Sequence, residues 1–154
     1  MTLFFFYFFF FFCFPVNGYA SDWAFCNDIA DGDTLFVRIR NRNETIRLLG
    51  VDTPEVKSKY TNEEPYGKEA SNYIRALVIR KKIRLEFDIE KRDKYNRLLA
   101  YVYLPDGRLL NRALIKKGYA RVYKIFKYKK KKEFMKLEQE AKIKCLGIWR
   151  KYCL

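Results

Sequence analysis

The order of apolar patterns along the chain predicts an α+β fold, a five-stranded Greek-key β-barrel of the OB type with three helices. Three observations support it: alternating apolar stretches typical of half-buried strands, one strong helical stripe in mid-chain, and turn residues that separate the elements. The predicted order, β-β-β-α-β-β-α-α, is the layout of an OB barrel. A chain of 154 residues suffices for one such domain with a short appendage.

The first half of the predicted barrel contains three strands and a helix. A strand around 24–29 precedes residues 34–40, in which apolar and polar side chains alternate. The polar turn 41–44 leads into a return strand over 45–51, so we expect a hairpin here. A helix over 70–78 follows, because its apolar residues recur at positions i, i+3, i+4, i+7 and i+8.

The second half is predicted to complete the barrel and to add two helices. Strands are expected over 82–88 and 98–104, and the second ends at the Pro-Asp-Gly turn 105–107. A short helix starts near Leu110 and stops at Gly118, a residue typical of helix C-termini. The last predicted helix carries four apolar residues on one face: Phe134, Leu137, Ala141 and Cys145.

Residues 1–20 have the pattern of an export signal. Every residue from Leu3 to Phe14 is apolar, but this run is too short to cross a hydrocarbon core of ~30 Å comfortably. Gly18 and Ala20 provide small residues at the −3 and −1 positions of a cleavage site after Ala20. We therefore expect a signal peptide over 1–20, a domain over 21–154 and a secreted or periplasmic location. An uncleaved segment would instead be a membrane anchor.

The charge of the chain restricts its partners and its chemistry. Lys and Arg total 32 against 18 Asp and Glu, and the net charge of +14 lies entirely within 21–154. Such a domain concentrates on polyanions, which include nucleic acid, anionic glycans and anionic membrane surfaces. The chain has no histidine, which excludes Ser-His-Asp and Cys-His nucleophile systems and any His-ligated zinc.

The cysteines argue for a disulfide rather than a metal centre. Cys26, Cys145 and Cys153 remain after the predicted cleavage, and none of them belongs to a CxxC pair. In an oxidising compartment they allow one disulfide and one free thiol. Three pairings are open at this point.

Two carboxylates mark a candidate metal site. Asp33 enters the second predicted strand and Asp52 leaves the third, so the hairpin brings them to the same end. Two carboxylates at one point repel each other unless a cation lies between them. Hard oxygen ligands without His or Cys favour Ca²⁺ or Mg²⁺ over zinc. The carbonyl of Thr53 can add a ligand, because Pro54 favours an extended backbone there.

Three further side chains near these carboxylates suit phosphodiester chemistry. Arg47 and Arg97 are candidate phosphate clamps, because a guanidinium presents a planar fork of donors that matches two phosphate oxygens. Glu55 follows Asp52 by three residues and can take a proton from an attacking water. These residue types together predict metal-assisted attack of water on a phosphodiester.

These stretches resemble the staphylococcal nuclease (thermonuclease) family. The resemblance covers residues 24–152, and its motifs occur in the family's order. The motifs are Asp31-Gly32-Asp33-Thr34, Arg47-Leu48-Leu49, Val51-Asp52-Thr53-Pro54-Glu55, Tyr66-Gly67-Lys68-Glu69-Ala70-Ser71, Asp93-Lys94-Tyr95 with Arg97, Leu99-Ala100-Tyr101, Asn111 to Leu114, Gly118, and Gly147-Ile148-Trp149.

The resemblance implies an OB barrel with three helices and calcium-dependent cleavage of single- and double-stranded DNA and RNA to 3′-phosphate ends. It implies that Asp33, Asp52 and the Thr53 carbonyl are calcium ligands, and that Asp31 reaches the ion through water. Glu55 is then the general base or the group that positions the attacking water. The implied phosphate-binding residues are Arg47 and Arg97.

The implied substrate contacts are Lys94, Tyr95, Tyr123 and Phe126, and here the chain departs from the family's pattern. The family has two tyrosines after the second helix, whereas this chain has Lys124 and Phe126 at those positions, with Tyr123 as a candidate substitute. Asn96 replaces a glycine after Tyr95, which is tolerable if its backbone is left-handed.

Two other classes of protein compete with a monomeric nuclease. One is a non-catalytic OB-fold module that binds nucleic acid by charge and stacking; the complete set of acids and arginines argues against it. The other is a cationic membrane-active protein, but the basic final helix is interrupted by Glu133, Glu138 and Glu140. We expect no stable membrane association after cleavage. The lysine run 127–132 is either a solvated face or a track for phosphates.

Overall fold

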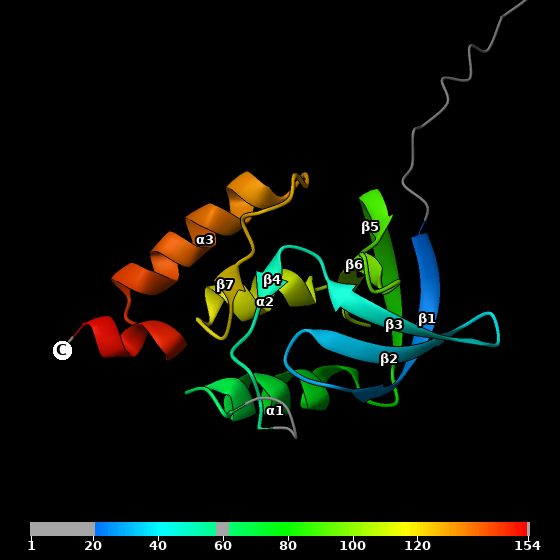
Figure 1. Cartoon of the computed structure of the whole chain (residues 1–154), viewed down its shortest axis with the longest axis horizontal. Helices are drawn as coiled ribbons and strands as arrows, with labels where there is room; N and C mark the ends of the chain where they lie inside the picture. Colours follow the sequence, from blue (N-terminus) through cyan, green and yellow to red (C-terminus); the bar gives the residue numbers. More distant parts are fainter. Residues whose placement is uncertain (1–20, 58–61, 154) are drawn as a thin grey trace, which may run out of the picture.

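The computed structural model describes residues 21–57 and 62–153, so the predicted signal peptide lies outside the described residues. Its centre is a closed five-stranded barrel, in the order β1-β2-β3-β6-β5 (Figure 1). All neighbouring strands are antiparallel except β3 and β6, which are parallel. The barrel strands are β1 (Ser21–Ile29), β2 (Thr34–Ile39), β3 (Arg42–Leu48), β5 (Lys82–Arg92) and β6 (Leu98–Tyr103).

The barrel closes around a dry aliphatic core. Because side chains alternate along a strand, every second residue points inward. Leu35, Ile46, Ile83 and Leu85 are fully buried there. Burial of such side chains stabilises each strand by about 1.5–3 kcal/mol per residue. The predicted five-stranded barrel is therefore confirmed.

Helices cover one end and one side of the barrel. In Figure 1, α1 lies along the lower end of the barrel, and α2 lies between the barrel and α3. The short 3₁₀ helix η1 follows α3 and carries the chain to its C-terminus. The helices are α1 (Gly67–Val78), α2 (Leu110–Lys116), α3 (Lys131–Ile143) and η1 (Gly147–Tyr152). None of the described helices is long and apolar enough to cross a membrane.

The third strand ends earlier than the sequence pattern predicts. It stops at Leu48, and Gly50 then takes a left-handed backbone with φ 76°. That conformation turns the chain out of the barrel, which glycine permits at little cost. The next two residues form β4 (Val51–Asp52), which pairs with β7 (Arg121–Val122) as a small separate sheet. This pair was not predicted, because a strand of two residues leaves no periodicity.

The C-terminal segment also differs from the prediction. The last helix ends at Ile143, so Cys145 is not part of its apolar face. Cys145 has φ 53° and forms a disulfide with Cys153, with an S–S distance of 2.10 Å. Among the cysteines that the structure describes, Cys26 is a buried free thiol. The disulfide closes the loop that contains η1.

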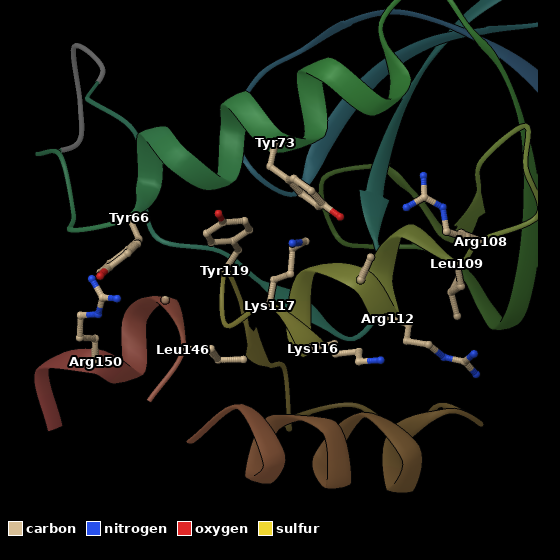
Figure 2. Close-up of a pocket in the computed structure, with 12 residues that line it drawn as sticks. Tyr66, Tyr73, Arg108, Leu109, Arg112, Lys116, Lys117, Tyr119, Leu146 and Arg150 are labelled. Atoms are coloured by element: carbon tan, nitrogen blue, oxygen red, sulfur yellow. The ribbon is translucent and has the colours of Figure 1, made fainter. Parts of the chain in front are cut away.

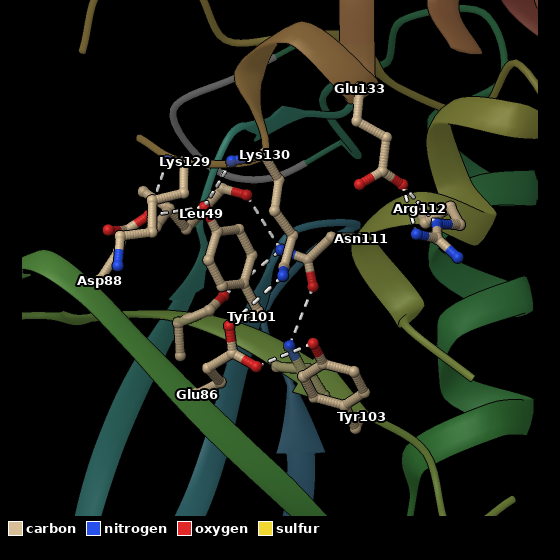
Figure 3. A network of polar contacts seen from close by, with 12 residues as sticks. Leu49, Glu86, Asp88, Tyr101, Tyr103, Asn111, Arg112, Lys129, Lys130 and Glu133 are labelled. Atoms are coloured by element: carbon tan, nitrogen blue, oxygen red, sulfur yellow. Dashed lines mark hydrogen bonds and ion pairs between the residues drawn. The ribbon is translucent and has the colours of Figure 1, made fainter. Parts of the chain in front are cut away.

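A polar network ties the segment after β7 to the barrel (Figure 3). The Asp88 carboxylate accepts hydrogen bonds from the Tyr101 hydroxyl at 2.7 Å and the Lys129 backbone N–H at 2.8 Å. Lys130 forms an ion pair with Glu86 at 3.3 Å. Because Asp88 is buried, its bonds have little competition from water. They hold the chain just after residues 123–126, where the predicted aromatic contacts lie.

Candidate active site

Asp33, Arg47 and Asp52 meet at one end of the β2–β3 hairpin. Thr34 pairs with Arg47 in the register of these strands, so the side chains beside them converge. Nη2 of Arg47 lies 2.8 Å from a carboxylate oxygen of Asp33 and 3.5 Å from one of Asp52. The predicted meeting of the two carboxylates is therefore present, with a guanidinium between them.

Burial makes Asp33 the most perturbed acid of this cluster. Burial raises the pKa of Asp33 to about 7, against the opposing effect of the Arg47 guanidinium. The nearby Asp31 carboxylate raises the same pKa further. Asp33 also accepts hydrogen bonds from the Thr34 hydroxyl at 3.0 Å and the Thr53 N–H at 3.2 Å. Because burial and the Asp31 carboxylate both disfavour the negative charge of Asp33, a positive charge beside it is stabilising.

Arg47 is held rigidly by acceptors on both sides. Its Nη1 donates to the carbonyl of Leu48 at 3.1 Å and to that of Val51 at 2.5 Å. The Arg47 side chain is only 15% exposed. Because its Nη groups serve carboxylates and carbonyls, binding a phosphate oxygen through Nη requires Arg47 to exchange one of these acceptors.

Arg97 is fixed by a tight turn between β5 and β6. Asp93 accepts hydrogen bonds from the backbone N–H groups of Tyr95 and Arg97 and binds Nε of Arg97 at 2.7 Å. Burial acts to raise the pKa of Asp93, but the hydrogen bonds from Arg97 hold it below its usual value. Asn96 has φ 65°, so the left-handed backbone expected at this position is confirmed.

The two Nη groups of Arg97 have no hydrogen-bond partner among the described residues. Arg97 lines a cavity of about 90 Å³, and Arg47, Tyr123 and Phe126 line the same cavity. The rings of Tyr123 and Phe126 lie 5.4 Å apart. Lys131 donates to the backbone carbonyls of Lys124 and Phe126 and so supports this aromatic turn. The cavity therefore unites both arginines with two of the predicted substrate contacts.

Lys94 and Tyr95 lie outside the lining of this cavity, on the exposed turn beside it. Tyr95 is 67% exposed, and the ammonium of Lys94 lies 5.0 Å from the centre of its ring. The Arg97 guanidinium lies 5.3 Å from the same ring. The exposed part of this ring is accessible to a planar base.

Glu55 is exposed at the edge of the acidic cluster. Partial burial raises its pKa, and the nearby carboxylates of Asp31, Glu64 and Asp52 raise it further. The Glu55 carbonyl accepts a hydrogen bond from the Glu64 N–H at 2.9 Å, which fixes the backbone at this point. Asp31 accepts a hydrogen bond from the Asp33 N–H at 2.9 Å and so shapes the turn before β2.

The donor set at Asp33, Asp52 and Thr53 fits a hard cation. Two carboxylates and a nearby backbone carbonyl are oxygen donors of the kind that Ca²⁺ takes. Within residues 21–57 and 62–153, no group of three or more His, Cys, Asp or Glu is arranged to hold a metal ion. The protein therefore offers few ligands, and such sites complete their coordination with water and substrate oxygens.

The lysine run 127–132 includes residues that contact the barrel. Tyr128 is buried, Lys130 pairs with Glu86, and the backbone of Lys129 is bound by Asp88. The helix α3 begins only at Lys131. Part of the run therefore belongs to the network of Figure 3, and the choice between a solvated face and a track for phosphates stays a prediction.

The structural role of Glu138 was not predicted from the sequence. It is buried on α3, accepts a hydrogen bond from the Val122 N–H at 2.9 Å and pairs with Lys124 and Lys142. Burial acts to raise the pKa of Glu138, but these hydrogen bonds hold it below its usual value. A signal was present: Glu138 falls four residues after Phe134 on the apolar face of the helix.

The comparison with family models matches residues 45–151 to the model described as staphylococcal nuclease homologue. The chain belongs to the staphylococcal nuclease family. Among relatives of this family, the thermonuclease of Staphylococcus intermedius is 40% identical over 125 residues, which cover 80% of this chain and 73% of the relative.

Two relatives from Bacillus subtilis (strain 168) are more similar in sequence but longer. The SPbeta prophage-derived endonuclease YokF and the endonuclease YncB are each 45% identical over 124 residues, or 79% of this chain. The match spans 42% of YokF and 58% of YncB. The staphylococcal nuclease domain described here thus corresponds to about half the length of these two proteins.

Proposed function

We propose that this protein is a calcium-dependent nuclease that hydrolyses phosphodiester bonds of DNA and RNA and leaves 3′-phosphate ends. One observation carries the proposal. Arg47 and Arg97 face the same small cavity, and Asp33 and Asp52 lie against Arg47 at its edge. Relatives named endonuclease and thermonuclease support the same reaction class.

In the proposed reaction the two arginines bind the phosphate that is attacked. A guanidinium donates two parallel hydrogen bonds to phosphate oxygens, and such donors stabilise the charge that builds up in the transition state by roughly 3–4 kcal/mol each. Arg97 is oriented for this role by Asp93, which occupies its Nε and leaves both Nη groups for the substrate. Tyr123 and Phe126 pack against a base of the bound strand.

Glu55 acts on the attacking water, as the base that takes its proton or as the acceptor that orients it. Its raised pKa is suited to proton transfer, a contribution typically of about 10²–10⁴ in rate. Asp33, Asp52 and the Thr53 carbonyl would hold calcium. When bound, calcium supplies positive charge that offsets these carboxylates and polarises the phosphate.

We further propose that residues 1–20 direct export and are removed after Ala20, which places the enzyme outside the cytoplasm. The disulfide between Cys145 and Cys153 supports this, because disulfides persist in oxidising compartments. The intact mass and N-terminal sequence of protein recovered from the medium or periplasm test the proposal. A chain beginning at Ser21 supports it, and a chain retained in the membrane with Met1 present contradicts it.

The function is tested by incubating the purified protein with single-stranded DNA, duplex DNA and RNA, in millimolar calcium and again with a calcium chelator. We expect degradation only with calcium, and products that carry 3′-phosphates. Binding of DNA without degradation in both conditions would replace this proposal with a non-catalytic binding module. Degradation that persists in the chelator would remove calcium from the mechanism.

A further inference from the structure

A second, larger groove lies between α1, α2 and η1. Its volume is about 750 Å³, and it shares no lining residue with the cavity of the candidate active site. Figure 2 shows α1 on one side and α2 on the other, with the chain around η1 at one end. The groove is lined by Tyr66, Tyr73, Arg108, Leu109, Arg112, Ala113, Lys116, Lys117, Tyr119, Leu146, Gly147 and Arg150.

The groove is basic, and its charge is only partly balanced. Five of the lining residues carry positive charge, and none of them is acidic. Asp106 pairs with Arg108 and Glu133 pairs with Arg112. The remaining cations, which are Lys116, Lys117 and Arg150, form no ion pair with the part of the chain that the structure describes.

Three tyrosines interleave with these cations. Figure 2 shows Tyr66 beside Arg150 and the side chain of Lys117 pointing toward Tyr73. The Lys117 ammonium lies 5.4 Å from the centre of the Tyr73 ring. The rings of Tyr73 and Tyr119 lie 5.3 Å apart and are tilted by 55°. Tyrosine is intermediate in exposure at all three positions, so the rings are partly available to a ligand.

A short extended segment connects the groove to the active-site cavity. Tyr119 lines the groove and Tyr123 lines the cavity, with β7 (Arg121–Val122) between them. Four residues of extended chain span at most about 14 Å. Arg121 lies on this path, opposite Asp52 in the β4–β7 pair. The two sites are therefore close enough for one flexible polymer strand to reach both.

We propose that this groove binds single-stranded nucleic acid beyond the scissile phosphate, as a second contact region for the polymer cut at the active site. Unpaired ammonium and guanidinium groups match phosphates, and partly exposed tyrosine rings match the faces of bases. Both kinds of contact are independent of sequence. That the ligand is nucleic acid rests on the proposed nuclease function. Binding of the strand in the groove can nevertheless be measured without cleavage.

The mixture of groups favours nucleic acid over other polyanions. An anionic membrane surface is flat, whereas these cations line a concave groove together with aromatic rings. An acidic peptide would satisfy the cations but gives the three tyrosines no regular planar partner. A nucleic acid strand supplies phosphates for the cations and planar bases for the rings.

The test measures equilibrium binding of oligothymidylates of about 4 and about 16 nucleotides, with a chelator present so that nothing is cleaved. The variant K116Q/K117Q/R150Q removes the three unpaired cations. We expect its affinity for the longer strand to fall at least tenfold. The slope of log affinity against log salt is negative and should become less steep by about 2, since each neutralised phosphate contributes about −0.7 on single strands.

A matched variant, R42Q/K91Q/K136Q, removes the same charge from exposed positions that line neither site. It should change the affinity for the longer strand less than threefold. A second groove variant, Tyr119→Leu, keeps an apolar side chain against Tyr73 but removes the stacking ring. It should lower affinity about fivefold with the salt slope unchanged. Thermal unfolding of each variant establishes that it is folded.

Equal losses in the groove variant and the matched variant would overturn the inference, because they would reflect total charge. Equal losses for the short and the long strand would also overturn it. Groove-dependent binding of vesicles with anionic lipid, without groove-dependent binding of the strand, would assign the groove to a membrane. If the protein cleaves DNA but shows no groove effect, the proposed function stands and this inference fails. If the groove variant weakens binding but the protein does not cleave DNA, this inference stands and the proposed function fails.

Discussion

The active-site cavity and the groove beside it both gather cations, but they hold them in different ways. Arg47 lies between two carboxylates, and Arg97 is clamped by Asp93. In the groove, Lys116 and Arg150 are exposed and form no ion pair with the described residues. A fixed guanidinium can stabilise one particular charge in a transition state, whereas a mobile cation can follow a phosphate wherever the strand places it.

The same kind of Asp–Arg turn occurs in the active-site cavity and in the groove, but its surroundings differ. The Asp93–Arg97 turn and the Asp106–Arg108 turn each place an aspartate on a backbone N–H and on Nε of the arginine. Arg97 is partly buried against the cavity, while Arg108 is exposed. Between these two turns the pairing is the same, and burial is what differs.

The largest expected effect is at Arg97. Arg97→Ala should lower kcat by about 10²–10³, because it removes a positioned donor to the transition state. Arg42→Ala removes an exposed arginine of β3 and should change kcat less than twofold. Steady-state kinetics on a short oligonucleotide measures both. Near-normal turnover by Arg97→Ala would show that the cavity is not the reacting site.

The disulfide variant tests whether the wall of the groove is separable from the cavity. C145S/C153S should lower the free energy of unfolding by about 2–3 kcal/mol, because the bond restricts the unfolded chain. Leu146, Gly147 and Arg150 lie in the loop it closes, so binding of a long strand should weaken more than cleavage of a short one. Urea unfolding and the two assays measure this. Equal loss in both assays would mean that the regions are coupled.

The clamp on Arg97 can be loosened without removing the arginine. Asp93→Asn keeps an oxygen for the backbone N–H groups but loses the charge that holds Nε of Arg97. We therefore expect kcat to fall about tenfold, or ~1.4 kcal/mol. The matched variant Asp106→Asn changes the equivalent turn and should leave kcat within twofold. If both variants behave alike, rigidity does not distinguish the cavity from the groove.

The smallest expected effect concerns Glu138, which holds the segment between the two sites. The pKa of Glu138 is below its usual value in the folded protein, so its charge stabilises the fold above the unfolded pKa of about 4.5. That stabilisation is lost as the pH falls through the lower, folded pKa. Glu138→Gln should cost about 1 kcal/mol at pH 7, and the cost should shrink as the pH falls below 4.5. Thermal unfolding across this range measures it, and a pH-independent cost would contradict the assignment.

Much of the barrel was predictable because its strands follow local rules. Alternation around Leu35 and the helical stripe ending at Val78 each report burial on one face, and the structure confirms both elements. The end of the third strand was not predictable in the same way. Its apolar pattern continues through Val51, while the left-handed turn at Gly50 moves that residue into a different sheet.

For the candidate site, the spacing of Asp33 and Asp52 on a hairpin was enough to predict that they meet. The place of Arg47 between them was not, since a strand pattern gives the side of the sheet but not the acceptors a long side chain reaches. The partner of Cys145 also stayed open until the fold brought Cys153 back to it. The roles of Glu55 and Arg97 in the reaction remain predictions for the assays above.

The sequence by itself determined the class of fold, the basic charge and the set of acids and arginines suited to phosphodiester chemistry, because periodicity and residue type act over short distances. The tertiary structure alone decided which cations are clamped and which are free. It also formed the groove, whose walls come from α1, α2 and η1, segments far apart in the chain. Contacts of that kind depend on packing in three dimensions, which no local pattern records.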